Sequence, residues 1–191
     1  MNKKKNGFTL IELLAVIVIL GILMAAVIPG VTNTINKSRR KTFLTNAEDI
    51  ITAVRNSMSS GEVKIAKGQE DAGGICQFPG AKQETVVNIV NSDTKYNALT
   101  YILEKGGVNS SFQQEYQKGY VIIVNDGTDD NNNFKYYISL VDNGKNGIGT
   151  PAKEDDIVKN QVGLVKTSNG GLTAQNSVAG YQTQYTCVIT E

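Results

Sequence analysis

The dominant pattern in the chain is a long apolar stretch close to its N-terminus. Residues 8–31 (FTLIELLAVIVILGILMAAVIPGV) hold one charged residue, Glu12, and every residue from 13 to 28 is apolar or glycine. A helix needs about 20 predominantly apolar residues to span a membrane, so this stretch is long enough. Three lysines in residues 1–7 (MNKKKNG) precede it, and the positive-inside rule places that end on the cytoplasmic side. The pattern predicts a membrane-spanning helix.

The helical pattern continues past the end of the apolar stretch. Apolar residues recur every three or four positions as far as Met58, except for one step of eight that skips the basic cluster at 37–41. Residues 59–61 (SSG) supply a stop. We expect one helix of about 50 residues, about 75 Å long, weakened at Gly21 and kinked at Pro29. Its apolar face comprises Ile28, Val31, Ile35, Phe43, Ala47, Ile50, Val54 and Met58.

Three interpretations of this N-terminus are open from composition. The first is a secretory signal peptide cleaved near residues 24–26, and the second is a plain signal anchor. The third is a short basic leader removed between Gly7 and Phe8, which leaves the apolar stretch at the start of the mature protein. An acidic residue in an apolar segment costs about 2.5–3.5 kcal/mol at mid-membrane and less near an end. This cost, and the helix that continues in phase, favour the third interpretation.

The hexapeptide at residues 7–12 (GFTLIE), following a lysine-rich leader, resembles the class III signal of type IV prepilins and pseudopilins. The resemblance implies that a membrane prepilin peptidase cleaves after Gly7 and N-methylates the new amine of Phe8. It implies a helix that anchors the subunit in the cytoplasmic membrane and later packs in the core of an extracellular filament. Gly21 and Pro29 fall where pilins commonly carry helix breakers.

Glu12 allows two roles. Thr9 and Glu12 fit a capping box, in which the glutamate reaches back to the N-cap amide and needs no partner molecule. The resemblance implies instead that the carboxylate pairs with the Phe8 ammonium of a neighbouring subunit. A buried charge without a partner costs several kcal/mol, so such a pair would set the axial register of the subunits. We favour the pairing role in assembly.

The remainder of the chain predicts a globular head with an α+β fold. We expect a cleaved leader (1–7), a transmembrane and filament-core helix (8–31), an amphipathic continuation (32–60) and a head (61–191). A long helix followed by strands is an α+β pattern, and pilin heads are similar, with the helix packed on an antiparallel sheet.

Within the head, strands are predicted at 120–124, 134–141 and 181–190, where β-branched and aromatic residues are bounded by Asn, Asp and Gly. Weaker strand candidates lie at 162–166 and 171–178. Residues 94–105 predict a helix capped by Asp93, residues 62–80 predict a loop, and residues 83–90 fit either a helical turn or a strand.

The two cysteines, Cys76 and Cys187, allow a disulfide or two free core thiols. An even cysteine count in an exported head favours a disulfide, because the destination is oxidising. Such a bridge would join the loop after the helix to the last strand.

The composition argues against several other classes of function. Lys and Arg total 19 against 18 Asp and Glu, which leaves no basic excess to bind nucleic acid by phosphate neutralisation. The chain has no histidine, and two cysteines are too few for a zinc site.

The acidic run at 126–133 suggests a calcium site. However, an EF-loop that starts at Asp129 would have Phe134 in place of the required glycine and Leu140 in place of the bidentate glutamate. A hairpin loop between two strands explains the same residues better. No catalytic motif appears. We expect neither an enzyme, nor a metal, nor a cofactor.

The sequence therefore predicts a type IV pilin-like structural subunit. It would start as a single-pass protein of the cytoplasmic membrane and, through a membrane assembly platform, join other pilin subunits in a surface pilus for adhesion, motility, aggregation or DNA uptake. One alternative is a pseudopilin of a type II secretion or competence system. The other is a monomeric, signal-anchored surface binding domain.

Overall fold

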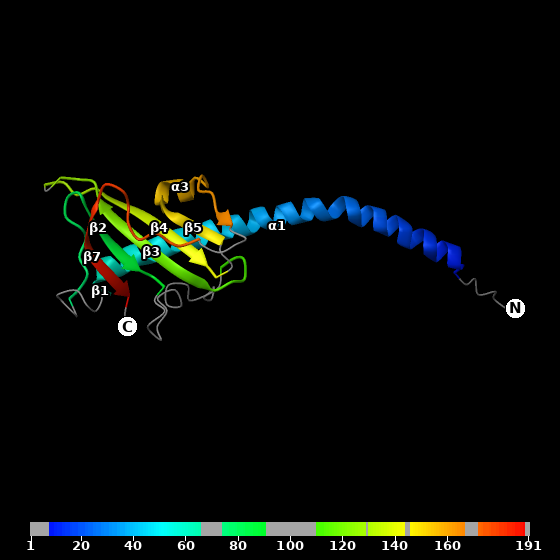
Figure 1. Ribbon diagram of the computed structural model, residues 1–191, viewed down its shortest axis with the longest axis horizontal. Coiled ribbons are helices and arrows are strands. Elements are labelled where there is room, and N and C mark those ends of the chain that lie inside the picture. The colour runs from blue at the N-terminus through cyan, green and yellow to red at the C-terminus, as the bar shows by residue number, and fades with distance from the viewer. Residues whose placement is uncertain are drawn as a thin grey trace. The chain divides into compact units, whose positions relative to one another are not determined.

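The computed structural model describes residues 8–65, 74–90, 110–128, 130–143, 146–166 and 172–189 (Figure 1). The chain divides into two compact units, Met1–Arg39 and Arg40–Glu191. Helix α1 (Leu10–Ser60) contributes to both units, and all other described elements belong to the second. The predicted leader and the predicted helix at 94–105, with its cap Asp93, lie outside the described residues.

Helix α1 has the ends that the sequence predicts. It begins at Leu10, directly after Thr9, and ends at Ser60. Gly61 follows with φ +76°, a left-handed conformation that glycine adopts without a Cβ penalty. The amide of Gly61 bonds the Met58 carbonyl at 3.3 Å, so the last turn is closed by its own backbone.

The second half of α1 buries the face that the spacing predicts. Phe43, Ala47, Ile50, Val54 and Met58 are all buried, while Ile28, Val31 and Ile35 on the same predicted face are exposed. Because the neighbours Leu44 and Ile51 are buried as well, the buried stripe is wider than the predicted one.

The second unit is built on one seven-stranded sheet, with strand order β1-β7-β2-β3-β4-β5-β6. All adjacent pairs are antiparallel except β2 and β7, which run parallel. The architecture is the predicted α+β arrangement, a long N-terminal apolar helix followed by a mostly antiparallel sheet. The strands are β1 (Val63–Ile65), β2 (Gln83–Asn88), β3 (Tyr116–Asn125), β4 (Phe134–Asp142), β5 (Asn146–Lys153), β6 (Val165–Lys166) and β7 (Gln182–Ile189), with the short helix α3 (Glu154–Val158) after β5.

The three main strand predictions are confirmed as β3, β4 and β7. Within the segment 83–90, residues Gln83–Asn88 form strand β2, so the segment is a strand and not a helical turn. Two predictions are wrong in part. The segment 62–80 is not all loop, because it contains β1. Of the weak strand candidate at 162–166, only the last two residues form a strand, β6. The candidate at 171–178 is wrong, because residues 172–178 form no strand. Part of this segment contacts the sheet instead: the Gln175 amide donates to the Ser139 hydroxyl at 3.0 Å, and Val178 packs against Val86, Ile122 and Val124.

The sheet separates two cores. On one face, the buried residues of α1 pack against Val87, Val121, Ile123, Ile138 and Leu140. On the other face, a smaller cluster of Val86, Ile122 and Val124 is covered in part by Val178 and Tyr181. Both faces of the central strands are therefore apolar, and residues 121–125 of β3 are all buried.

Candidate functional site

The first turn of α1 closes as a capping box. The Thr9 amide donates to Glu12 Oε2 at 2.8 Å, the Thr9 hydroxyl donates to the same oxygen at 2.9 Å, and the Glu12 amide donates to Thr9 Oγ1 at 3.4 Å. Both bonds to the carboxylate fall on Oε2. The capping role of Glu12 therefore leaves its second oxygen, Oε1, available to a further donor, and the two sequence hypotheses for this residue are compatible.

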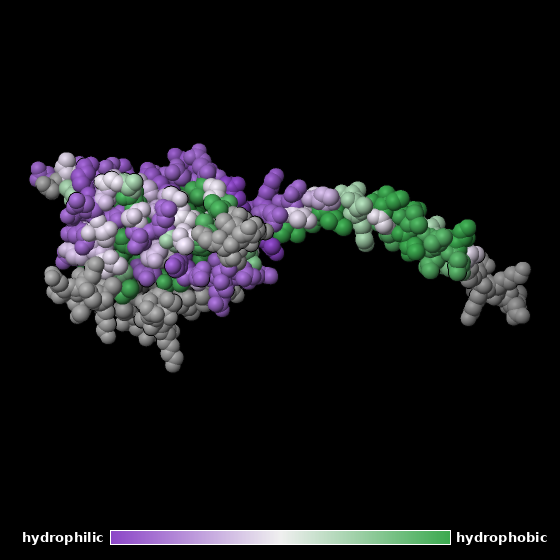
Figure 2. Space-filling view, in the orientation of Figure 1, coloured by the Kyte–Doolittle hydropathy of each residue, from purple (hydrophilic) through white to green (hydrophobic). Residues whose placement is uncertain are grey.

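The apolar half of α1 is fully displayed in the isolated chain. Figure 2 shows hydrophobic surface along the N-terminal part of the helix, where Phe8 is 85% exposed, Ile11 72% and Leu23 56%. Among the described residues, α1 is a helix long and apolar enough to cross a membrane. Soluble monomers rarely expose apolar surface of this extent, so this half of the helix is built to be covered by lipid or by other chains.

Neither Gly21 nor Pro29 interrupts α1, which runs through both residues. Two threonines just beyond the proline bond back to the helix: the Thr32 hydroxyl donates to the Ile28 carbonyl and the Thr34 hydroxyl to the Gly30 carbonyl, each at 3.0 Å. Such bonds satisfy polar groups within the helix itself, as an apolar environment requires.

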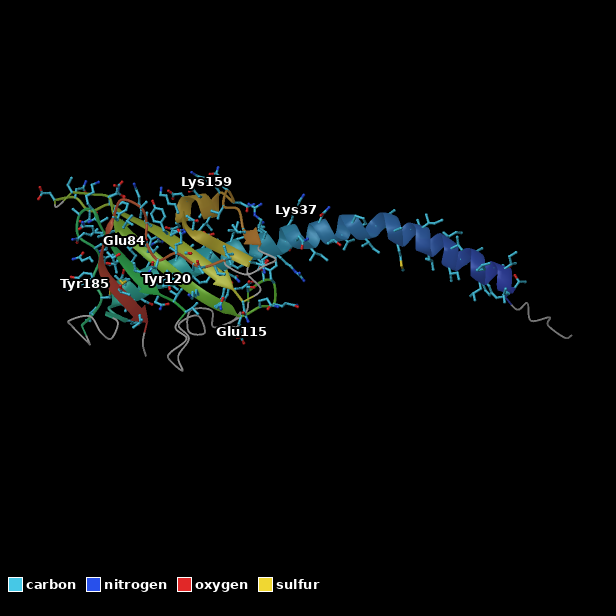
Figure 3. All side chains as sticks on the ribbon, in the orientation of Figure 1. Lys37, Glu84, Glu115, Tyr120, Lys159 and Tyr185 are labelled. Atoms are coloured by element: carbon cyan, nitrogen blue, oxygen red, sulfur yellow. A yellow bond between two sulfur atoms is a disulfide. The ribbon has the colours of Figure 1, made fainter. Side chains whose placement is uncertain are left out.

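A basic cluster follows on the same helix, at residues 37–41. Lys37 (Figure 3) and Lys41 are exposed. Arg40 is the first residue of the second unit, and its guanidinium donates to the Val162 carbonyl within that unit at 2.7 Å. Within the cluster, Arg40 is therefore held by a hydrogen bond, whereas Lys37 and Lys41 are exposed.

The two cysteines form the predicted disulfide. Cys76 and Cys187 are bridged, with their Cα atoms 6.1 Å apart and 111 residues between them in sequence. Both are buried. Cys187 lies in β7, so the bridge ties that strand to the segment that precedes β2.

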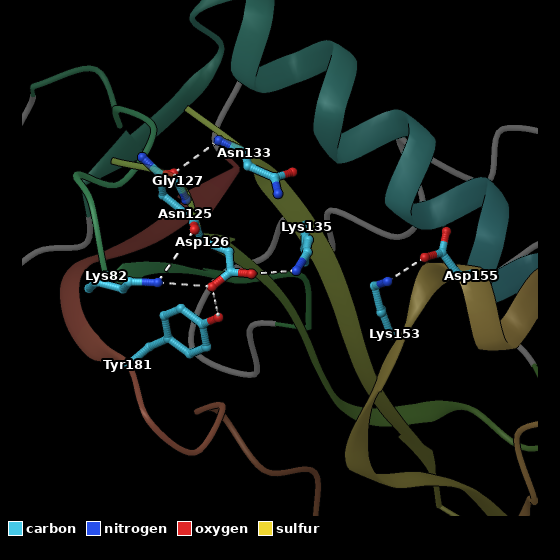
Figure 4. Close-up of polar contacts among 9 residues, drawn as sticks. All are labelled: Lys82, Asn125, Asp126, Gly127, Asn133, Lys135, Lys153, Asp155 and Tyr181. Atoms are coloured by element: carbon cyan, nitrogen blue, oxygen red, sulfur yellow. Dashed lines mark hydrogen bonds and ion pairs between the residues drawn. The ribbon is translucent and has the colours of Figure 1, made fainter. Parts of the chain in front are cut away.

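The acidic run after β3 is a hairpin loop whose first carboxylate is already neutralised (Figure 4). Asp126 Oδ2 accepts from Lys135 Nζ at 2.5 Å, and Oδ1 accepts from Lys82 Nζ and the Tyr181 hydroxyl, both at 3.1 Å. These groups, Lys135 first, hold the pKa of the Asp126 carboxyl well below its usual range. The buried Asn125 shapes the loop by accepting from the amides of Gly127 and Asn133.

The connection between β4 and β5, after Asp142, is held by a buried carboxylate. Asp142 accepts from the Ser110 hydroxyl and from the Asn146 amide, each at 2.7 Å. Its oxygens are used to fix the turn between β4 and β5. The described part of the chain contains no group of three or more side chains that could hold a metal ion, and Asp129 lies outside that part.

The sequence did not predict two sets of internal polar contacts, around Arg55 and around Glu84. Arg55 of α1 lies over the Tyr136 ring at 4.3 Å from its centroid and pairs with Glu154 at 2.5 Å. Burial raises the pKa of the Tyr136 phenol. Glu84 in β2, fully buried, accepts from the Val178 amide at 2.9 Å and the Thr183 hydroxyl at 2.8 Å. These partners are about 100 residues apart in sequence, so no local spacing could reveal them.

Two comparisons with known proteins match the chain. Residues 2–28 match the family described as the prokaryotic N-terminal methylation motif. A protein of Dichelobacter nodosus named "Probable minor fimbrial protein" is 32% identical over 111 residues, which cover 51% of this chain and 70% of that protein. No solved structure matches the chain.

Proposed function

We infer that this chain, which belongs to the type IV pilin family, is a structural subunit that polymerises with other pilin subunits into a filament on the cell surface. The family is one of structural fimbrial subunits, so the prediction that the chain is not an enzyme is confirmed by its membership. One observation carries the proposal: the exposed apolar half of α1 holds a single carboxylate, in its first turn.

The proposed life cycle has two stages. A prepilin peptidase removes residues 1–7 between Gly7 and Phe8 and methylates the Phe8 amine, while α1 holds the precursor in the cytoplasmic membrane. A membrane assembly platform then moves the subunit into the filament, where the apolar half of α1 is covered by the helices of its neighbours. Burial against these helices replaces lipid contacts by protein contacts, so the transfer needs no exposure of the apolar surface to water.

Glu12 is proposed to select the position of each new subunit. Thr9 donates two hydrogen bonds to its Oε2, and its Oε1 would accept a hydrogen bond from the Phe8 ammonium of a neighbouring subunit. A carboxylate in apolar surroundings is strongly destabilising unless it is paired, so a subunit that docks out of register leaves this charge uncompensated. The capping box keeps the carboxylate near the helix N-terminus, where a neighbour's amine would have to arrive.

The Glu12→Gln variant tests this role, because glutamine can still close the capping box but cannot form an ion pair with an ammonium. We expect the variant to insert in the membrane and be cleaved, yet to give few or no filaments. Asp49→Asn, which removes an exposed carboxylate from the same helix, is the matched control and should assemble normally. The measurement is the yield of sheared filaments against the amount in the membrane fraction. Wild-type yield from Glu12→Gln would reduce Glu12 to a cap.

The mature N-terminus separates the proposal from the anchored-monomer alternative. Intact mass and N-terminal sequencing should find a chain that begins at Phe8 with a methylated amine. A start near Val27 would show that an ordinary signal peptidase acts and would overturn the proposal.

The pseudopilin alternative is separated by immunogold microscopy, since a secretion or competence pseudopilin does not form long surface filaments.

A further inference from the structure

The face of the sheet opposite the buried residues of α1, which we call the outer face, carries a group of tyrosines. Tyr120, Tyr137 and Tyr181 pack against the smaller core on this face, and all three are half-buried. A tyrosine has an apolar ring and a polar hydroxyl, so a partly accessible ring can contact a ligand through both. The outer face therefore presents aromatic surface to the surroundings of the head.

The charged side chains that the register places on this face of β3, β4 and β5 are all lysines. Because side chains alternate along a strand, Lys135, Tyr137 and Val141 of β4 share the outer face. Lys118 of β3 lies opposite Val141, and Lys153 of β5 lies opposite Tyr137. The tyrosines are therefore bordered by basic side chains on three neighbouring strands.

The positive charge that remains after internal pairing lies at two ends of this face. Lys118 is exposed and forms no ion pair within the described part of the chain. At the other end, Lys135 and Lys82 share the single carboxylate of Asp126, at 2.5 and 3.1 Å, which leaves one net positive charge (Figure 4). The third lysine of the face is paired with a carboxylate of α3. The buried carboxylate of Glu84 in β2 is already bonded within the fold.

The distance between the two ends matches a sparsely charged polymer. Lys118 is level with Val141, and Lys135 lies six residues further along β4, which is about 20 Å at 3.4 Å per residue. Tyr120 and Tyr137 occupy the two levels between them. A polysaccharide of uronic acids has the same order, because whole sugar rings separate its carboxylates. The apolar C–H faces of these rings can pack on tyrosine rings while the sugar hydroxyls bond the phenols.

A nucleic acid strand is a poorer match to this face. In duplex geometry each strand carries one phosphate per 3.4 Å, so about six phosphates would lie along the same length. The face offers two net positive charges over that distance, and the whole chain has no large basic excess. Charge complementarity therefore favours the polysaccharide.

We propose that the outer face between Lys118 and Lys135 binds an acidic polysaccharide built from uronic acids. Its carboxylates are bound by Lys118 at one end and by the pair of Lys82 and Lys135 at the other, and its sugar rings lie over Tyr120 and Tyr137. All these residues belong to the second unit, so the site is complete in the unassembled chain. The inference goes beyond the proposed filament function and does not depend on it.

The test titrates the full-length chain, in micelles of a non-ionic detergent, with oligogalacturonate and follows binding by calorimetry. Neutral dextran, oligothymidylate and polyglutamate are the comparison ligands. We expect wild type to bind oligogalacturonate more tightly than any of the three, and the binding to weaken in 1 M sodium chloride. Lys118→Gln should weaken it about two- to fivefold, and Tyr120→Leu, which keeps an apolar side chain over the core, about two- to tenfold.

Lys41→Gln is the matched control, because it removes an exposed lysine from α1, whose buried residues pack on the other face of the sheet. It should bind oligogalacturonate as wild type does. Guanidinium unfolding shows whether each variant is folded, and Lys118→Gln should keep the wild-type midpoint because Lys118 is exposed.

Several results would overturn the proposal. They are the absence of oligogalacturonate binding by wild type, undiminished binding by Lys118→Gln, and an equal loss in Lys41→Gln. Equal or tighter binding of oligothymidylate would assign the face to nucleic acid, and the same result with polyglutamate would assign it to an acidic protein. Equal binding of dextran would show that the lysines take no part. None of these results bears on filament yield, so the proposed function is tested separately.

Discussion

Removal of the Cys76–Cys187 bridge should cost the head about 5 kcal/mol of unfolding free energy. The bridge closes a loop of 111 residues. The chain-entropy relation for such a loop gives a loss of about 16 cal/mol/K in the unfolded state, or about 4.8 kcal/mol at 25 °C. Domains are stable by about 5–15 kcal/mol in total. The Cys76→Ala/Cys187→Ala variant should therefore lose at least a third of its stability.

The assay is guanidinium unfolding of the full-length chain in detergent micelles, followed by tyrosine fluorescence, since the chain has eight tyrosines and no tryptophan. Reduced wild-type protein serves as the control and should unfold at nearly the same midpoint as the double variant. A loss below about 2 kcal/mol would refute the reasoning, because loop closure in the unfolded state would then not be the main contribution of the bridge.

Three further predictions concern the head. Lys135 and its neighbours lower the pKa of the Asp126 carboxyl, so the carboxylate stabilises the folded head at pH values above its unfolded pKa of about 3.9. This contribution to the unfolding free energy is lost as the pH falls through the lower pKa of the folded state. The Asp126→Asn variant should lack this acid-induced loss when its unfolding free energy is measured as a function of pH. Arg55→Met, which removes both the ion pair and the cation–π contact, should cost about 1 kcal/mol in guanidinium unfolding, and a neutral result would show that the contact is not stabilising. Gly147→Ala should cost about 1–3 kcal/mol in the same assay, because a Cβ would stand 2.1 Å from a backbone carbonyl of β4; Gly163→Ala, with open space around it, is the neutral control.

The sequence predicted those features that depend on local pattern. The end of α1 at Ser60, the capping box at Thr9 and the strands β3, β4 and β7 all follow from spacing, caps and β-branched composition. The Cys76–Cys187 bridge followed from an even count and an exported head, not from geometry.

Strand β5 (Asn146–Lys153) was missed because its composition is typical of a turn. It contains two glycines and a proline, all unfavourable in a strand. Tertiary packing makes them fit: Gly149 leaves room for the Leu172 side chain, and Pro151 lies in the part of β5 that has no partner from β6, which pairs with Asn146 and Gly147. These contacts join segments distant in sequence, so no local window could show them.

The placement of β7 between β1 and β2 has a consequence for the order in which the head can fold. Strand β7 follows every other strand in the chain, so β1 and β2 each keep an unpaired edge until it has been synthesised. Strand β2 ends at Asn88 and strand β7 starts at Gln182. At a synthesis rate of about 5–20 residues per second, the stretch between them takes about 5–19 s to synthesise. Unpaired edges invite pairing with other chains. The nascent subunit therefore passes through an interval in which the edges of β1 and β2 are open to pairing with other chains, and that interval ends when β7 is inserted between them.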